Sequence, residues 1–244
     1  PIKTHATKKK EYQIEHYQIN KKNITIYNPQ GSNPSVLVIP QLKGADTLAH
    51  WCAKEYASNG IASCVLEAEE LDEKFTKVEF EEWAKENYQT HKDLTIWLKN
   101  FEEPHVGVVG ISFGAIVAAS LAKDLQTDAS VMIMGSSNLQ GVVQNSHLGI
   151  IKQLMKKIPQ ESIKYLQDPK QCAKYVNPKT SFLFISKYDK TVPTKFQEEL
   201  RQDFSNPKTT YLPTNHYLTA LYLREIIKDS SEFLEDKLVN HSTK

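Results

Sequence analysis

The sequence predicts an α/β fold in which a mostly parallel central sheet carries helices on both faces. Short apolar runs typical of buried strands recur along the chain, at 36–39, 61–66, 106–109, 131–134 and 181–186. Stretches with helical spacing separate these runs. Strands that are apolar on both sides need helices over both faces of the sheet, and strands joined through crossover helices pair in parallel.

The elements of the first half follow from side-chain periodicity and from stop signals. Residues 11–19 alternate between polar and apolar side chains, and a second strand-like run at 24–27 follows, so an N-terminal antiparallel hairpin is expected at the sheet edge. A helix over 46–58 should end at the Asn-Gly pair that follows it. An amphipathic helix is predicted over 78–101, where aromatic side chains at helical spacing indicate core packing.

The interval 135–180 is too long for a plain crossover between two strands. Helical spacing over 148–158 and 162–166, interrupted by proline, predicts a small helical cap insertion at 136–180. We interpret the whole chain, 1–244, as a single domain that carries this cap over its site. The predicted substrate-binding residues on the apolar face of the cap are Ile150, Ile151, Leu154 and Ile158. The alternative is a crossover helix that packs away from the pocket.

The most informative motif is the turn Gly110-Ile111-Ser112-Phe113-Gly114. An apolar strand-like run precedes it and a stretch of helical character follows it, so the serine lies at a sharp turn from strand to helix. A G-x-S-x-G turn of this kind strains the serine backbone and exposes its Oγ above the sheet edge, beside the N–H groups of the helix N-terminus. Ser112 is therefore the candidate nucleophile.

A nucleophilic serine needs a base, and on this type of turn the base is a histidine that follows both the serine and an acid in the chain. His147, His216 and His241 follow Ser112. His241 lies in a polar tail, and His147 precedes the best acid. His216 lies in a loop between a short strand-like run and the terminal helix, which makes it the candidate base.

The acid should leave the carboxyl end of a buried strand on the side of the serine. Asp189 meets this condition, because it follows the dense β-branched and aromatic run 181–186. Asp168 precedes a proline and is typical of a turn, while Asp203 lies in a charged helical stretch. The alternative role for Asp189 is to cap the turn or helix that follows it.

With these three points, the sequence resembles the α/β-hydrolase superfamily, in its branch of small esterases, thioesterases and dienelactone-hydrolase-like enzymes. The resemblance extends from the strand before Pro40 to the terminal helix. It implies the α/β-hydrolase fold and a triad of Ser112, Asp189 and His216, with no metal and no organic cofactor.

The resemblance also implies an oxyanion hole of two backbone N–H groups. The first belongs to Phe113, directly after the nucleophile. The second comes from the turn after the strand 36–39, where the family often has His-Gly and this chain has Pro40-Gln41-Leu42. Leu42 is the matched donor, with Gln41 next to it. A bulky Gln41 in place of glycine alters the shape of the hole but removes no catalytic side chain.

The function implied is hydrolysis of a small-molecule carboxylic ester or thioester through an acyl-enzyme on Ser112. The same triad would also support an acyltransferase or a peptidase, because the acceptor of the acyl group leaves no motif. A protein of a different class, a binding protein that keeps the fold without catalysing a reaction, is the other alternative. The missing His-Gly turn favours it, and the intact Ser, Asp and His argue against it. Zinc hydrolysis is disfavoured because no metal-ligand spacing links the histidines.

Composition argues against several other classes. The chain has 30 basic and 29 acidic residues, so no general attraction to nucleic acid is expected. No run approaches the roughly eighteen apolar residues of a membrane span. The three cysteines, Cys52, Cys64 and Cys172, lack disulfide or zinc spacing and favour a cytoplasmic location. Because the first residue is Pro1, a removed signal peptide stays open, and the sequence leaves the oligomeric state open as well.

Overall fold

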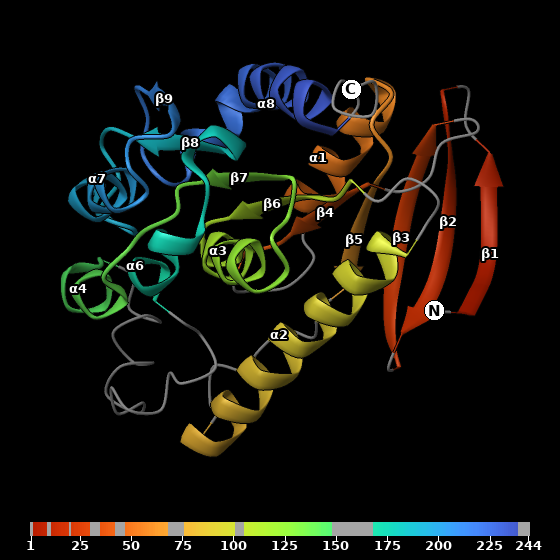
Figure 1. Cartoon of the computed structure of the whole chain (residues 1–244), viewed down its shortest axis with the longest axis horizontal. Coiled ribbons are helices and arrows are strands. Elements are labelled where there is room, and N and C mark those ends of the chain that lie inside the picture. Colours follow the sequence, from red (N-terminus) through yellow and green to blue (C-terminus); the bar gives the residue numbers. More distant parts are fainter. Residues whose placement is uncertain are drawn as a thin grey trace.

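A computed structural model describes residues 2–8, 11–19, 21–29, 35–41, 47–67, 76–100, 105–147 and 168–238. Within these ranges nine strands form one sheet, in the order β1-β2-β3-β5-β4-β6-β7-β8-β9 (Figure 1). The strands are β1 (Ile2–Lys8), β2 (Tyr12–Ile19), β3 (Lys22–Pro29), β4 (Val36–Ile39), β5 (Ser63–Glu67), β6 (Gly107–Ile111), β7 (Ala129–Ile133), β8 (Ser181–Ser186) and β9 (Lys208–Leu212).

The sheet is parallel from β5 to β9 and antiparallel from β1 to β5. The apolar strands therefore pair as their pattern predicts, and the mostly parallel α/β sheet is confirmed. In the parallel part, Ile111 of β6 pairs with Ile133 of β7, which pairs with Phe184 of β8. The carboxyl ends of these strands consequently meet at one edge of the sheet.

Helices cover both faces of the sheet, as Figure 1 shows for α1 and α8 on one face and for α2 and α3 on the other. The helices are α1 (Thr47–Ser58), α2 (Lys77–Lys99), α3 (Phe113–Leu125), α4 (Leu139–Asn145), α6 (Pro169–Cys172), α7 (Thr194–Asp203) and α8 (Leu223–Leu238). The short 3-10 helices are η2 (Ala173–Tyr175), η3 (Pro178–Thr180) and η4 (Leu218–Tyr222).

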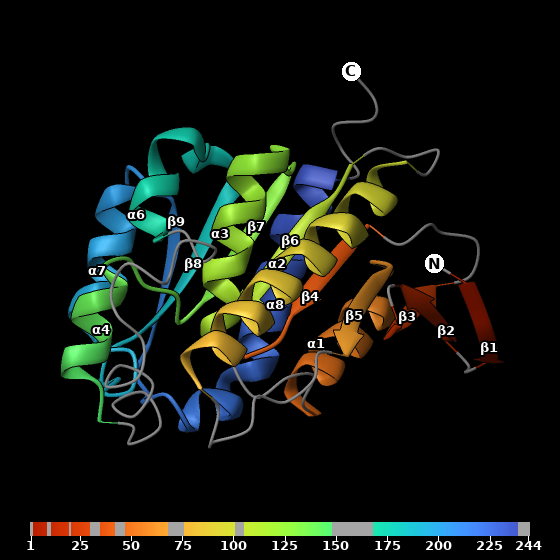
Figure 2. The ribbon, with the colours of Figure 1, turned by 90° about the horizontal axis from the view of Figure 1, so that it is seen from below.

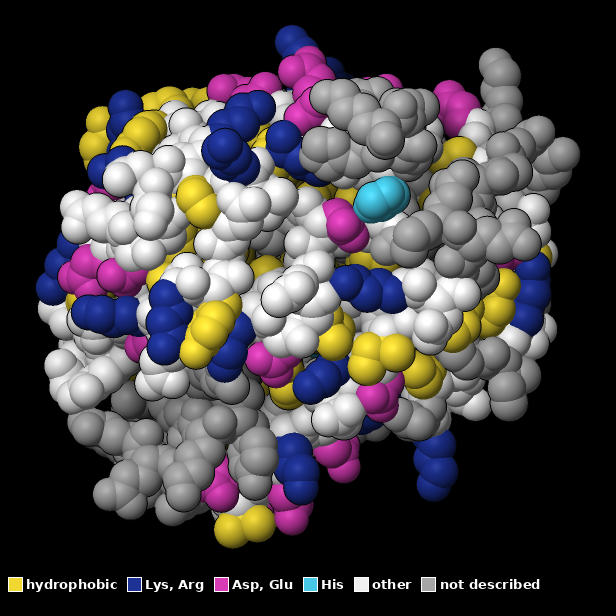
Figure 3. Space-filling model, in the orientation of Figure 1, with side chains coloured by type: hydrophobic (Ala, Val, Ile, Leu, Met, Phe, Trp, Pro, Cys, Tyr) yellow, Lys and Arg dark blue, Asp and Glu magenta, His cyan; other side chains and the backbone are white. Residues whose placement is uncertain are grey.

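The antiparallel strands β1 to β3 lie at one end of the molecule, and α4 and α7 lie at the opposite end (Figure 2). The predicted hairpin is confirmed as β2 and β3, whereas β1 was not predicted. On the face shown in Figure 3, basic and acidic side chains are interspersed rather than gathered by sign. Among the helices that the structure describes, none is long and apolar enough to cross a membrane.

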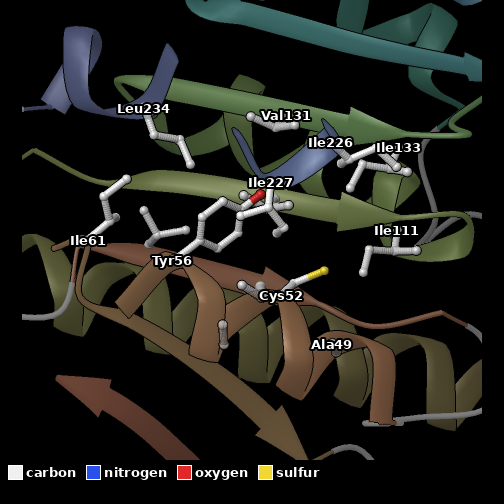
Figure 4. Close-up of a cluster of buried hydrophobic side chains, with 14 of the residues drawn as sticks. Ala49, Cys52, Tyr56, Ile61, Ile111, Val131, Ile133, Ile226, Ile227 and Leu234 are labelled. Atoms are coloured by element: carbon white, nitrogen blue, oxygen red, sulfur yellow. The ribbon is translucent and has the colours of Figure 1, made fainter. Parts of the chain in front are cut away.

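The core lies on both sides of the sheet because alternate side chains of each strand point to opposite faces. Val36 and Val38 of β4 pack toward α1 and α8, whereas Leu37 and Ile39 pack toward α2 and α3. Figure 4 shows the first of these clusters, in which Cys52 and Tyr56 of α1 lie across from Ile226, Ile227 and Leu234 of α8. The buried Tyr56 hydroxyl is hydrogen-bonded to Ser230 of α8 at 2.8 Å. This bond ties the two helices of that face together.

Predicted helix boundaries agree closely with the observed ones. The helix expected over 46–58 is α1, and the Gly60 backbone beyond its end has a φ of 86°, a conformation that favours glycine. The helix expected over 78–101 is α2, which begins after a capping box between Thr76 and Glu79 and ends earlier than predicted, at Lys99. Its cap is Asn100, whose N–H is hydrogen-bonded to Trp97 O.

The interval between β7 and β8 contains α4, α6, η2 and η3 in its described parts. The predicted pocket-lining residues Ile150, Ile151, Leu154 and Ile158 lie outside the described residues, so the cap over the site stays a prediction. Helix α4 packs against α7, where Gly141 lies directly against the Phe196 ring.

Candidate active site

Ser112 lies at the turn between β6 and α3, with a φ of 54° and a ψ of −112°. Such a positive φ is strained for any residue with a side chain and is the conformation expected of a nucleophile at a strand-to-helix turn. The turn is held by a hydrogen bond from Ser112 N to Ile133 O, at 2.8 Å. The Ser112 side chain is half-buried.

The two glycines of the turn permit close approaches of backbone to backbone. A Cβ on Gly110 would collide with Gly114 O and with the Ala115 backbone. A Cβ on Gly114 would collide with the carbonyl oxygens of Ile39 and Pro40, at the end of β4. The second collision shows that the serine turn lies directly against the segment that follows β4.

Asp189 follows β8, and its side chain is fully buried. Its Oδ1 accepts hydrogen bonds from the backbone N–H groups of Thr191 at 2.8 Å and Val192 at 3.0 Å. Its Oδ2 accepts from His216 Nδ1 at 2.8 Å and from Gln197 Nε2 at 3.1 Å. Four donors thus satisfy the hydrogen-bonding capacity of one buried carboxylate.

His216 lies in the loop after β9, with one tenth of its side chain exposed. An ionised Asp189 has no proton to donate, so its Oδ2 accepts and His216 Nδ1 donates. In the neutral imidazole the proton then lies on Nδ1, and Nε2 is the basic nitrogen. The loop is held by Thr214, whose carbonyl accepts from Tyr188 N at 3.0 Å and from Ser186 Oγ at 2.5 Å. The loops that carry the acid and the base are thus bonded to each other.

The histidine loop also packs against the strand ends beside the serine turn. Thr219 Oγ1, in η4, is hydrogen-bonded to Met134 Sδ at 3.2 Å, directly after β7. Ile111, Met134 and Thr219 line one small apolar cavity between the strand ends, α1 and the start of α8. Ser112, Asp189 and His216 therefore lie at the same edge of the sheet.

Two of the three predicted oxyanion donors, Phe113 and Gln41, are described and lie beside this turn. Phe113 is the first residue of α3, so its N–H has no partner within the helix. Gln41 is half-buried and follows the Pro40 carbonyl that touches Gly114. Leu42 lies outside the described residues. Their role in an oxyanion hole stays a prediction.

Of the rejected candidates, Asp168 has a structural role, and His147 lies beside the acid loop, where its backbone N–H is hydrogen-bonded to Lys190 O at 2.9 Å. Asp168 caps two helices, because its carboxylate accepts from the backbone N–H groups of Asn138, Leu139 and Lys170. Asp203 ends α7, and His147 is exposed after α4. His241 lies outside the described residues.

One neighbour of the acid was missed by sequence reasoning, namely Gln197 on α7. No motif marks a glutamine in an amphipathic helix, and its contact with Asp189 arises only from the way α7 packs against the acid loop. Among the described residues, no group of three or more histidine, cysteine, aspartate or glutamate side chains could hold a metal ion. The three cysteines form no disulfide, and burial raises the pKa of the Cys172 thiol to about 11.

No model of a known protein family matches the chain, and no curated protein matches its sequence. Solved structures do match. An esterase of Pyrococcus furiosus has a TM-score of 0.67 at 14% identity, covering 93% of each chain. Carboxyl esterase 2 of the fungus Tuber melanosporum has a TM-score of 0.69 at 12% identity, covering 94% of this chain and 89% of its own.

An acylaminoacyl peptidase of Pyrococcus horikoshii gives a TM-score of 0.71 at 16% identity, with 94% of this chain matching 42% of that longer one. At such identities the likeness concerns the fold alone. The neighbours fall in the α/β-hydrolase superfamily, so the resemblance noted in the sequence is confirmed at the level of the fold. The chain has the α/β-hydrolase fold.

Proposed function

We propose that the chain is a serine hydrolase that cleaves a carboxylic ester or thioester of a small molecule through an acyl-enzyme. The observation that carries the proposal is the 2.8 Å hydrogen bond between His216 Nδ1 and the buried Asp189, at the sheet edge that also carries Ser112. Esterase neighbours with the same fold support the class of reaction. The three thiols without a disulfide support a cytoplasmic location.

In the proposed mechanism, His216 Nε2 takes the proton of Ser112 Oγ while Oγ attacks the substrate carbonyl carbon. The carbonyl oxygen becomes an oxyanion that accepts hydrogen bonds from the N–H of Phe113 and from Leu42 or Gln41. The imidazolium then protonates the leaving alcohol or thiol, which departs as the acyl-enzyme forms. Water, deprotonated by His216, releases the acid and restores Ser112. Asp189 stays ionised throughout and holds the ring.

A second candidate is peptide-bond cleavage on the same residues, which the acylaminoacyl peptidase neighbour favours. The two reactions share the acyl-enzyme and differ in the leaving group. Comparing a p-nitrophenyl ester with an N-acyl p-nitroanilide of the same acyl group separates them. The pocket residues Ile150, Ile151, Leu154 and Ile158 remain the predicted acyl-binding residues.

The test is labelling with a fluorophosphonate, followed by peptide mapping. We expect one labelled residue, Ser112, and hydrolysis of p-nitrophenyl acetate that Ser112→Ala reduces to background. The matched control is Ser120→Ala, a buried serine of α3 whose Oγ donates to Ile116 O at 3.2 Å and lies 4.0 Å from Cys172 Sγ. A folded wild type that is neither labelled nor active would contradict the proposal and favour a binding protein.

A further inference from the structure

A buried glutamine on α7 joins three parts of the candidate active site. Gln197 is 1% exposed. Its Oε1 accepts from Ser186 N, at the end of β8, at 3.0 Å. Its Nε2 donates to Val192 O at 2.7 Å and to Asp189 Oδ2 at 3.1 Å. One amide thus connects the strand end, the loop after the acid and the acid itself.

The orientation of this amide is dictated by the backbone. Ser186 N–H can only donate, so the amide oxygen must face it, and Val192 O can only accept, so the amide nitrogen must face it. With both ends determined in this way, Nε2 is also the atom that faces Asp189 Oδ2. The donor role of Gln197 toward the acid is therefore independent of any choice between the oxygen and nitrogen positions of the side chain.

The two oxygens of Asp189 have different kinds of partner. Oδ1 is held by the N–H groups of Thr191 and Val192, which belong to its own loop. Oδ2, which accepts from His216, has Gln197 as its other partner. Because Gln197 also holds Val192 O, the same amide fixes the loop and the oxygen that orients the imidazole.

The charged surroundings of the amide are simple. The ionisable groups joined to it directly or through one hydrogen bond are Asp189 and His216. The other ionisable side chains of the acid loop, the neighbouring turns of α7 and the end of α4 are exposed or half-exposed. They are Lys187, Tyr188, Lys190, Lys195, Glu198, Glu199, Arg201 and His147.

We infer that Gln197 is a positioning residue of the proposed triad, which holds Asp189 Oδ2 in the orientation that keeps His216 in the productive tautomer. The inference rests on the proposed function and adds a fourth residue to it. Gln197 is not expected to touch the substrate, so its loss should lower kcat and leave KM unchanged.

The test compares Gln197→Glu with Gln202→Glu, which adds the same charge at an exposed position of the same helix. The new carboxyl can still accept from Ser186 N. At low pH its single O–H can replace one of the two hydrogen bonds of the amide nitrogen, the one to Asp189 Oδ2, whereas at high pH it is ionised and faces a second carboxylate. The ratio of variant to wild-type kcat/KM for p-nitrophenyl acetate should therefore fall about tenfold or more between about pH 6 and about pH 9.

Gln202→Glu should give a flat ratio over the same range. Gln197→Met keeps the length of the side chain without its hydrogen bonds, and we expect kcat to fall about tenfold or more at every pH, with KM within about twofold. All three variants are compared with wild type at temperatures where circular dichroism shows them folded.

Three other outcomes would overturn one of two different claims. A Gln197→Glu ratio that is flat with pH, or a Gln197→Met variant with wild-type kcat, would show that the glutamine only supports the fold and would overturn the inference alone. A wild type that has no turnover and no label on Ser112 would overturn the proposed function itself.

Discussion

The acid assignment leads to the most demanding prediction, which concerns Asp189→Asn. An asparagine has one acceptor oxygen where the carboxylate has two, and Asp189 accepts from four donors. If the amide oxygen faces the N–H groups of Thr191 and Val192, the NH₂ group faces His216 Nδ1. The imidazole then adopts the other tautomer, in which Nε2 carries the proton and cannot take one from Ser112.

The expected loss is large and specific. In a comparable triad the same change costs about ten thousandfold in kcat, which corresponds to about 5 kcal/mol of transition-state stabilisation. Replacing charged by neutral hydrogen bonds should also lower the free energy of unfolding by about 2 kcal/mol. Both quantities are measurable, from the kinetics of p-nitrophenyl acetate hydrolysis and from denaturant unfolding.

The matched control is Asp203→Asn, the same substitution at the end of α7. Asp203 Oδ2 is buried and has no hydrogen-bond partner among the described residues, and Asp203 makes no contact with the triad there, so the change should leave kcat within about twofold of wild type. The reasoning fails if Asp189→Asn keeps kcat within about tenfold of wild type, or if Asp203→Asn is the more damaging change.

Three further predictions concern stability and specificity. Asp168→Ala removes the acceptor of three backbone N–H groups and should lower the free energy of unfolding by about 2 kcal/mol, with unchanged kcat in the folded enzyme; a loss of kcat without a loss of stability would contradict the capping role. Burial lowers the pKa of His91 from 6.5 to about 4. At pH values between these two pKa values, the unfolded chain binds more protons than the folded chain does. The free energy of unfolding therefore falls as the pH falls, by about 2 kcal/mol from about pH 7 to about pH 5, and His91→Leu should abolish this part of its pH dependence. Leu154→Trp should shorten the preferred acyl chain and spare acetyl esters, since each buried methylene contributes about 0.8 kcal/mol; a chain-length profile that is flat in wild type and unchanged in the variant would restore the crossover-helix alternative.

Much of the fold was predictable because its information is local. The apolar runs of β4, β6 and β8 contain the β-branched and aromatic side chains of strands buried on both faces, and α1 ends at a recognisable Asn-Gly pair. Strand β1 was missed because Ile2–Lys8 is mostly polar. An edge strand of this kind pairs mainly through its backbone, which leaves little trace in the side-chain pattern.

The candidate site was predictable for a related reason. The turn around Ser112 has a local motif, and chain order together with strand ends then selects Asp189 and His216, which the structure joins by a hydrogen bond. Their catalytic roles stay predictions. Gln197 could not be found in this way, because its role depends on the docking of α7 against a loop, a tertiary contact with no fixed sequence spacing.

The contact between α1 and α8 has a consequence for how the protein is made. Tyr56 and Ser230, whose side chains are hydrogen-bonded, are separated by 174 positions in the sequence. During synthesis the apolar face of α1, with Ala49, Cys52 and Tyr56, therefore emerges from the ribosome long before α8, which packs beside it. Strands β3, β4 and β5 can cover part of that face earlier, but until residues 223–238 have left the ribosome the cluster lacks the side chains of α8, and completion of this half of the core depends on the arrival of that helix.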